Sequence, residues 1–337
     1  MNIKCDRIND RETNSKMNTA SDNKQTDKGT LELIDRMLNF FAVNAFSFTV
    51  GAMCLVHAVL LSAAVAFAEP QADANRAAAG GEPKISVFAS AIHRTAKERG
   101  VSLAEAADLL YGLGIRGFDT SAFDGNLAAL AATKLKPVNL YCFPDMYAAD
   151  NGAEECARVL DAAEKYGVPR VMVVPSNFRK NGDKEADFAK VLSGVRMFVD
   201  EGSKRGITIT IEDFGGTENP CSSASRLKRM LDEIPGLRFA LDSGNLYYAG
   251  RGDDIVDMMK YAKGRIEHVH LKDQLKEDCR KYATLGLGAV PNETIVRSLA
   301  ADGYDGWYTL EDLVGDAYLD AVRQVAVLKV WLAEKGK

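Results

Sequence analysis

Ile211-Glu212-Asp213-Phe214 is the first of four short stretches that decide the fold predicted for this chain. Each stretch ends a predicted β-strand with a side chain that binds metal ions well. The other three are Ala240-Leu241-Asp242-Ser243, His268-Val269-His270-Leu271 and Tyr308-Thr309-Leu310-Glu311. The candidate ligands Glu212, Asp242, His270 and Glu311 are separated by 30, 28 and 41 residues. Because one strand with its crossover helix takes roughly 30 residues, this spacing predicts four neighbouring parallel strands.

The four side chains are expected to meet at one end of a barrel, because barrel active sites lie at the carboxyl ends of the strands. Three carboxylates and one imidazole, with no thiolate, suit Mn²⁺, Mg²⁺, Co²⁺ or Zn²⁺. We therefore predict one divalent metal ion held by Glu212, Asp242, His270 and Glu311. An acidic residue at a strand end is also commonly a solvated or turn-forming carboxylate. The prediction therefore depends on the four residues taken together.

The same alternation of strands and helices continues through residues 84–337. Strands are predicted at Ile85–Ser90, Ile115–Asp119, Val138–Phe143, Arg170–Val174, Thr208–Glu212, Arg238–Asp242, Glu267–Leu271 and Trp307–Glu311. Amphipathic helices are predicted at Leu103–Tyr111, Ala153–Tyr166, Phe188–Lys204, Ser222–Leu231, Asp254–Ala262 and Tyr318–Lys335. Eight strands alternating with helices indicate a single (β/α)₈ TIM barrel, an α/β fold. A doubly wound open sheet is the alternative, but no G-x-G-x-x-G motif follows the first strand.

The chain before the barrel has a different composition. Residues 1–36 are polar and rich in Asn, Asp, Lys and Thr, which predicts a disordered leader. Residues 38–68 contain no acidic residue, lysine or arginine, and they end in Ala66-Phe67-Ala68, an A-x-A cleavage pattern. We therefore predict a signal peptide at 37–68, a linker at 69–83 and an exported protein, periplasmic or secreted. If it is not cleaved, the same segment is long enough to anchor the chain in a membrane.

Composition excludes some partners. The chain has 337 residues, 47% of them hydrophobic, and a net charge of −5 without a long basic run. Binding to nucleic acid needs clustered Lys and Arg, so no nucleic-acid partner is predicted. The six cysteines form no CxxC pair and are interpreted as small buried hydrophobic residues. A disulfide is the alternative, and the predicted export favours it slightly. Only two tryptophans are present, which favours a pocket for a small substrate over a broad aromatic platform for polysaccharides.

At these residues the chain resembles the sugar phosphate isomerase/epimerase family, the xylose isomerase-like TIM barrels. The likeness covers residues 85–337 approximately. It rests on Glu212, on Asp-Ser-Gly-Asn at 242–245, on His-Val-His-Leu-Lys-Asp at 268–273, and on Gly-Tyr-Asp-Gly-Trp at 303–307 before Glu311. The resemblance implies the same four metal ligands. Two positions depart from the family pattern, because Asn245 and Phe214 stand where many members carry histidine.

The resemblance implies a metal-dependent sugar isomerase or epimerase that acts on a small sugar or keto-sugar. The metal would stabilise an enediolate as a Lewis acid. Glu212 and Glu311 would transfer the proton as catalytic base and acid. The predicted substrate-binding residues are Lys272, Asn245, His268 and Asp119, and His268 could instead orient a ligand.

Two other functions remain open at this point. One is a lyase or dehydratase acting on a keto-sugar or keto-inositol, which starts with the same proton abstraction. The other is a barrel that binds sugars without turning them over. Barrels of this family often associate, so a homo-oligomer is also allowed, although no interface can be identified from the sequence.

Overall fold

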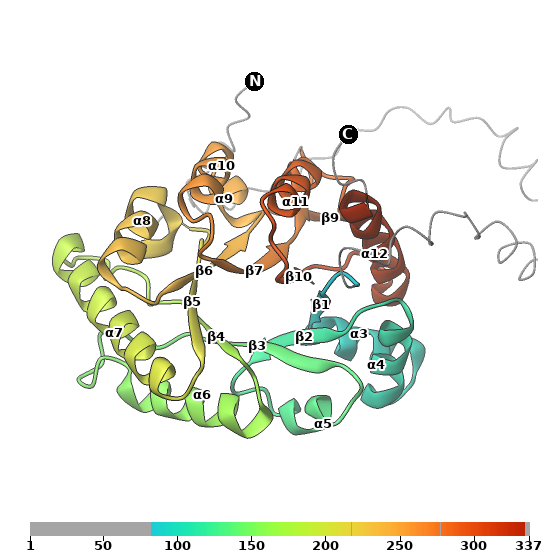
Figure 1. Cartoon of the computed structure of the whole chain (residues 1–337), viewed down its shortest axis with the longest axis horizontal. Helices are drawn as coiled ribbons and strands as arrows, with labels where there is room; N and C mark the ends of the chain where they lie inside the picture. Colours follow the sequence, from blue (N-terminus) through green and yellow to red (C-terminus); the bar gives the residue numbers. More distant parts are fainter. Residues whose placement is uncertain (1–81, 217, 277, 334–337) are drawn as a thin grey trace, which may run out of the picture. The chain divides into compact units, whose positions relative to one another are not determined.

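Eight parallel strands close into a barrel in the computed structural model (Figure 1). The structure describes residues 82–216, 218–276 and 278–333. The strands are β1 (Ile85–Phe88), β2 (Gly117–Ser121), β3 (Lys136–Cys142), β4 (Arg170–Val173), β5 (Thr208–Glu212), β6 (Arg238–Asp242), β7 (Ile266–Leu271) and β10 (Trp307–Leu310). They follow one another around the barrel in chain order, and β10 closes the ring on β1. The predicted (β/α)₈ barrel is thereby confirmed.

Helices surround the ring of strands on the outside (Figure 1). The longer ones are α3 (Ala89–Arg99), α4 (Leu103–Gly112), α6 (Ala153–Tyr166), α7 (Lys184–Lys204), α8 (Ala224–Glu233), α10 (Gly252–Tyr261), α11 (Asn292–Ala301) and α12 (Ala317–Ala333). Short elements add α5 (Leu127–Ala131), η2 (Pro220–Ser222), α9 (Asn245–Tyr248) and an antiparallel pair, β8 (Asp273–Gln274) with β9 (Tyr282–Ala283). No helix within the described part of the chain is long and apolar enough to cross a membrane. The predicted leader and signal peptide, and most of the linker, lie outside the described residues.

The predicted and observed strand boundaries differ at the first strand, and this difference bears on the site. The strand was predicted to end at Ser90, but β1 ends at Phe88 and α3 begins at the next residue without a connecting loop. The buried positions Ala89, Ile92 and Ala96 are spaced as on one face of a helix. Phe88 ends the strand and directly precedes the packed helix, so its backbone position is fixed on both sides.

The apolar core lies mainly between the strands and the helices. It includes Phe118, Phe239, Leu241 and Val269 on the strands, which alternate with residues that face the barrel interior. Cys142, Cys156 and Cys221 are buried as free thiols, and Cys279 is disulfide-bonded. The interpretation as small buried hydrophobic residues therefore holds for the first three cysteines and not for Cys279.

The barrel interior carries a polar layer instead of the usual branched apolar side chains. Ser86, Asp119, Asn139, His268 and Thr309 have no exposed surface. Ser86 Oγ lies 2.6 Å from Thr309 Oγ1, and Asn139 Nδ2 donates to Asp119 Oδ2 at 2.9 Å. Barrels are normally filled with bulky aliphatic residues, and burying polar groups costs free energy unless they are hydrogen-bonded. This layer therefore indicates a functional requirement at the middle of the barrel.

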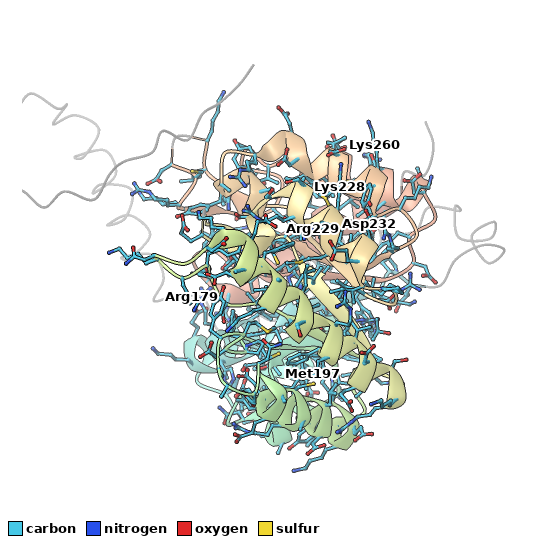
Figure 2. All side chains as sticks on the ribbon, turned by 90° about the vertical axis from the view of Figure 1, so that its left-hand side faces the viewer. Arg179, Met197, Lys228, Arg229, Asp232 and Lys260 are labelled. Atoms are coloured by element: carbon cyan, nitrogen blue, oxygen red, sulfur yellow. The ribbon has the colours of Figure 1, made fainter. Side chains whose placement is uncertain are left out.

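The outer surface of the helices is charged. Lys228, Arg229 and Asp232 lie on α8, on the side of the molecule shown in Figure 2. Lys228 Nζ is 2.6 Å from an Asp257 carboxylate oxygen on α10, and Arg229 Nη1 is 2.8 Å from Glu185 on α7. Exposed ion pairs of this kind contribute about 0–1 kcal/mol each. The apolar core, and not these pairs, holds the helices against the barrel.

Candidate metal centre and active site

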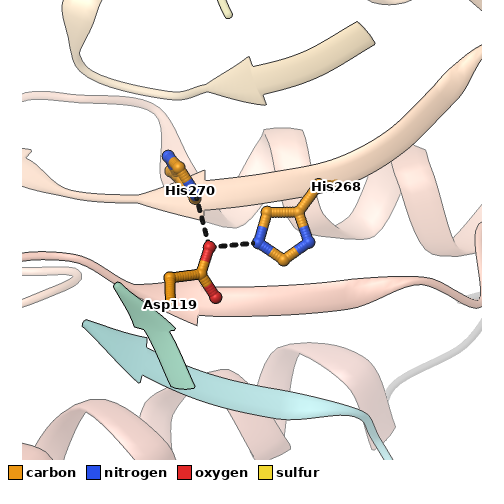
Figure 3. A group of neighbouring side chains, drawn as sticks. All are labelled: Asp119, His268 and His270. Carbon is orange, nitrogen blue, oxygen red and sulfur yellow. Dashed lines mark hydrogen bonds and ion pairs between the residues drawn. The ribbon is translucent and has the colours of Figure 1, made fainter. Parts of the chain in front are cut away.

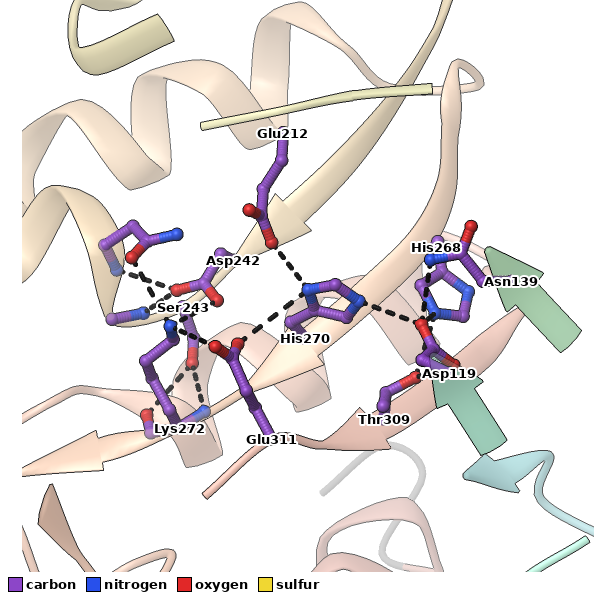
Figure 4. A network of polar contacts seen from close by, with 12 residues as sticks. Asp119, Asn139, Glu212, Asp242, Ser243, His268, His270, Lys272, Thr309 and Glu311 are labelled. Atoms are coloured by element: carbon purple, nitrogen blue, oxygen red, sulfur yellow. Dashed lines mark hydrogen bonds and ion pairs between the residues drawn. The ribbon is translucent and has the colours of Figure 1, made fainter. Parts of the chain in front are cut away.

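Glu212, Asp242, His270 and Glu311 come together at the carboxyl ends of four neighbouring strands (Figure 4). One potential ligand atom from each residue lies within 4.8 Å of the others. Glu212 and Asp242 end β5 and β6, His270 is the penultimate residue of β7, and Glu311 follows β10. Three of the side chains are buried, and Glu311 is 21% exposed. The structure thus brings all four predicted ligands to the end of the barrel where the sequence placed them.

The cluster has the properties of a site for a divalent cation. Asp242 Oδ2 and Glu311 Oε2 are buried atoms that accept no hydrogen bond from any described residue. The Lys272 ammonium lies 3.1 Å from Asp242 Oδ2 and 2.7 Å from Glu311 Oε1. An imidazole binds a metal only in its neutral form, so in that state three carboxylates would face a single ammonium. The remaining negative charge and the oxygen-rich donor set fit a divalent ion.

Asp119 supports His270 from below the cluster (Figure 3). His270 Nε2 is 3.1 Å from Asp119 Oδ2, while Nδ1 is 2.5 Å from Glu212 Oε1 and 3.8 Å from Glu311 Oε2. Nδ1 therefore faces the other ligands, and Nε2–H can donate to Asp119. A carboxylate behind a histidine ligand fixes its tautomer and ring orientation and makes it more basic.

His268 also contacts Asp119, the carboxylate behind His270. Its Nε2 lies 2.7 Å from Asp119 Oδ2 and 2.9 Å from Thr309 Oγ1. Asp119 was predicted to bind substrate, and His268 either to bind substrate or to orient a ligand; both are fully buried, below the candidate metal ligands. This placement favours a positioning role for the two residues over contact with a sugar hydroxyl.

Burial and neighbouring charges shift the pKa values of the cluster. Burial raises the pKa of Glu212, against the opposing effect of His270. Burial also raises the pKa of Asp242 to about 7, despite the nearby Lys272 ammonium. Burial alone would lower the pKa of His270, but the Glu212 and Asp119 carboxylates together outweigh it and hold that pKa well above its usual value. Glu212 and Asp242 therefore accept a proton more readily than exposed carboxylates do.

Lys272 and Asn245 lie beside the ligand cluster, where Lys272 is buried and Asn245 is partly buried. Lys272 Nζ is 3.3 Å from Asn245 Oδ1. The glycine at position 244 leaves room for the lysine, because a Cβ there would lie 2.4 Å from Lys272 Cγ. The backbone N–H groups of Gly244 and Asn245 both donate to Asp242 Oδ1, at 2.8 and 2.7 Å. This turn leaves the other Asp242 oxygen directed toward the cluster.

Asp213 is a site residue that the sequence reasoning did not single out, although it stands inside the first quoted stretch. Its Oδ1 accepts a hydrogen bond of 2.7 Å from the backbone N–H of Asp242, and its side chain is fully buried. Burial and the neighbouring Asp242 raise the pKa of Asp213 well above its usual value. Asp213 therefore ties the end of β5 to the end of β6 and fixes the position of one ligand.

If Asp119 orients His270, the Asp119→Asn variant should bind a divalent metal about 10–100-fold more weakly than the wild type, the usual effect of losing such a partner. The amide keeps the size of the side chain but removes the charge behind the imidazole. Competition with a chelator would measure the affinity. Asp187→Asn is the matched control. Asp187 is a buried carboxylate on α7 that pairs with Arg179, and it is outside the ligand cluster. Equal metal affinity in wild type and Asp119→Asn would contradict the positioning role.

Comparisons with known proteins agree with this architecture. A family model described as xylose isomerase-like TIM barrel matches residues 89–328. The inosose dehydratase of Geobacillus thermodenitrificans (strain NG80-2) is 23% identical over 145 residues, which cover 38% of this chain and 47% of that protein. The matched region thus spans about half the length of this curated relative.

Solved structures share the fold at low sequence identity. The 3-keto-D-glucoside 4-epimerase from E. coli superposes with a TM-score of 0.57 at 16% identity, covering 74% of this chain and 99% of that chain. The IolI protein, solved with a bound zinc atom, superposes with a TM-score of 0.61 at 15% identity, covering 75% of this chain and 99% of that chain. At these identities the likeness establishes the fold alone.

Proposed function

Because this chain belongs to the xylose isomerase-like TIM barrel family, we propose that it is a metal-dependent enzyme that removes a proton next to the carbonyl of a small keto-sugar. The family includes epimerases and dehydratases. The observation that carries the proposal is the convergence of Glu212, Asp242, His270 and Glu311 at the mouth of the barrel. Of the reactions that begin with this step, we favour isomerisation or epimerisation.

A divalent ion at this cluster would polarise the carbonyl and stabilise negative charge on its oxygen. Glu212 and Glu311 stand at the two ends of the arc of ligands, on β5 and after β10. One carboxylate can take the proton from the carbon and the other can return one to the opposite face, which inverts that centre. Return of the proton to the neighbouring carbon would isomerise the sugar instead.

Lys272 has a separate role in this proposal. Burial would lower its pKa, but Asp242 and Glu311 outweigh burial and raise the pKa of Lys272 well above its usual value. The side chain therefore stays charged at neutral pH. It can donate hydrogen bonds to a developing oxyanion or to a substrate hydroxyl, together with the Asn245 amide beside it.

Dehydration is the second candidate, and the matched inosose dehydratase favours it. This reaction starts with the same proton abstraction and continues by loss of a hydroxyl from the next carbon. Asn245 and Phe214, where many family members carry histidine, are compatible with either outcome. A barrel that only binds sugars is the third reading, and the complete set of ligands argues against it.

The proposed location limits the substrate. The charge-free segment at 38–68 supports export, and sugar phosphates are mainly cytoplasmic metabolites. We therefore propose an unphosphorylated substrate. Among Mn²⁺, Mg²⁺, Co²⁺ and Zn²⁺, zinc is the first ion to test, because a structural neighbour holds it.

Incubation with keto-sugars in D₂O tests the proposal. The metal-loaded protein should be mixed with D-fructose, D-tagatose and 2-keto-myo-inositol, and the products followed by NMR and mass spectrometry. An isomerase or epimerase should incorporate deuterium without loss of water, whereas a dehydratase should release water and form an unsaturated ketone. Absence of both exchange and elimination across a broad panel of keto-sugars would contradict the proposed function.

A further inference from the structure

An unbroken series of aromatic rings leads from the metal cluster to the surface. The Phe88 ring meets the His270 imidazole edge to face, with centroids 5.0 Å apart. Phe88 and Tyr141 are 5.6 Å apart, and Tyr141 and Phe143 are 5.9 Å apart. The last ring, Phe143, is 60% exposed. These three aromatic residues, Phe88, Tyr141 and Phe143, are called the aromatic wall below.

The direction of the aromatic wall follows from the pleat of β3. Side chains two residues apart on a strand share a face. Asn139 points into the barrel, where it donates to Asp119, so Tyr141 lies on the same face and nearer the mouth. Phe143, the first residue after β3, packs its ring against Tyr141. Burial, with Asp124 and two site carboxylates nearby, raises the pKa of Tyr141, as expected for a phenol at the entrance of an acidic site.

A second set of apolar side chains extends the aromatic wall around the mouth. Met172, Val174 and Ala240 form a small buried cluster that is separate from the main core. Tyr141 and Phe214 pack against this cluster. One side of the site therefore carries apolar side chains, at Phe88 on β1, Tyr141 on β3 and Met172 on β4. The candidate metal ligands and Lys272, from β5 to β10, form the other side.

A two-sided site of this kind matches the two-sided surface of a sugar ring. The hydroxyl groups at the edge of the ring suit the polar side, and the C–H groups on its face suit aromatic rings, since apolar surface is stabilised when removed from water. One ring held at the metal cluster would cover Phe88 and the inner part of Tyr141. The exposed Phe143 lies one ring further out, beyond the reach of that sugar.

We propose that Tyr141 and Phe143 form an outer subsite for a second ring, so that the preferred substrate is a glycoside of a keto-sugar. The inference rests on the proposed function for the inner ring. The second ring can be a sugar or an aromatic group, because both present an apolar face to the rings of Tyr141 and Phe143.

Simple glucosides serve as probes for this subsite. Calorimetry on the zinc-loaded full chain should compare methyl β-D-glucoside with phenyl β-D-glucoside and cellobiose. The two-ring ligands are expected to bind about tenfold more tightly, which corresponds to about 1.4 kcal/mol. The Phe143→Ala variant should remove this advantage and leave the affinity for methyl β-D-glucoside unchanged. Its exposed position makes loss of folding unexpected, and circular dichroism would check this.

Tyr111→Ala is the matched control, because Tyr111 is an aromatic residue on α4 that is 37% exposed and lies outside the aromatic wall. It should leave every affinity unchanged. Equal affinity for the methyl and phenyl glucosides, or no detectable binding of the two-ring ligands, would overturn the outer subsite. Loss of metal binding or of deuterium exchange on keto-sugars would instead overturn the proposed function, so the two failures are distinguishable.

Discussion

The His270→Ala variant should contain no bound divalent metal, whereas the wild-type protein should carry about one equivalent, as a single four-ligand site implies. His270 is the only nitrogen ligand of the cluster, and its Nδ1 lies 2.5 Å from Glu212 Oε1. Its loss would leave three carboxylates as candidate ligands and would remove the imidazole that holds Glu212 in place. Elemental analysis after gel filtration, with each of the four candidate ions supplied in turn, measures the effect.

His93→Ala is the control for this experiment. His93 lies on α3, is 35% exposed, and is outside the ligand cluster, so this variant should keep the full metal content. Wild-type protein that stays free of metal after exposure to all four ions would contradict the assignment of the ligands. A sugar-binding barrel without a metal would then be the better reading.

Replacing Glu311 by glutamine should lower turnover by about 10²–10⁴-fold, the usual contribution of a general acid or base. The amide keeps an oxygen in place but cannot accept the proton. It also weakens the contact with Lys272, whose Nζ lies 2.7 Å from Glu311 Oε1. Steady-state kinetics on the keto-sugar identified in D₂O should be combined with the metal content of the variant, because Glu311 is also a candidate ligand.

Glu267→Gln is the matched control for the Glu311 variant. Glu267 lies near the start of β7, where it pairs with Arg170 at the opposite end of the barrel, so turnover should be unchanged. A Glu311→Gln variant with full metal content and full activity would rule out the proton-transfer role. A protein that only binds sugars would keep most of its affinity in this variant.

The arrangement of the four ligands could be predicted from the sequence because each one ends, or nearly ends, a recognisable strand. β5 and β6 were predicted with the bounds that the structure shows, Thr208–Glu212 and Arg238–Asp242. Once strand ends are known, a closed parallel barrel brings them to one face. Spacing by one strand–helix unit was therefore sufficient to collect the ligands.

The depth of a residue along the barrel could not be predicted in the same way. Asp119 was predicted to bind substrate because it ends the predicted second strand, yet β2 continues to Ser121 and Asp119 lies beside His268, below the candidate ligands. Relative height depends on the tilt and stagger of the strands around the barrel, and no single strand encodes these. The register places Asp119 beside Asn139 on β3 and beside Phe88 on β1.

The aromatic wall was not predicted, although the sequence contains a signal for it. Asn139, Tyr141 and Phe143 alternate with Leu140 and Cys142, which is the pattern of a strand with two different faces. Counting tryptophans alone led to the expectation of a small pocket. The alternation becomes informative only when Asn139 is known to face the barrel interior.

Strand β7 and the residue that follows it carry His268, His270 and Lys272 on the same side, at three successive heights. Inserting or deleting one residue ahead of His268 would turn all three side chains out of the barrel together. A slip of two residues would keep them facing inward but would exchange their levels, so that lysine or the deeper histidine would stand where His270 stands now. Evolution can therefore vary the identity of residues in this strand but not its length, and homologues should place their insertions in the connections on either side.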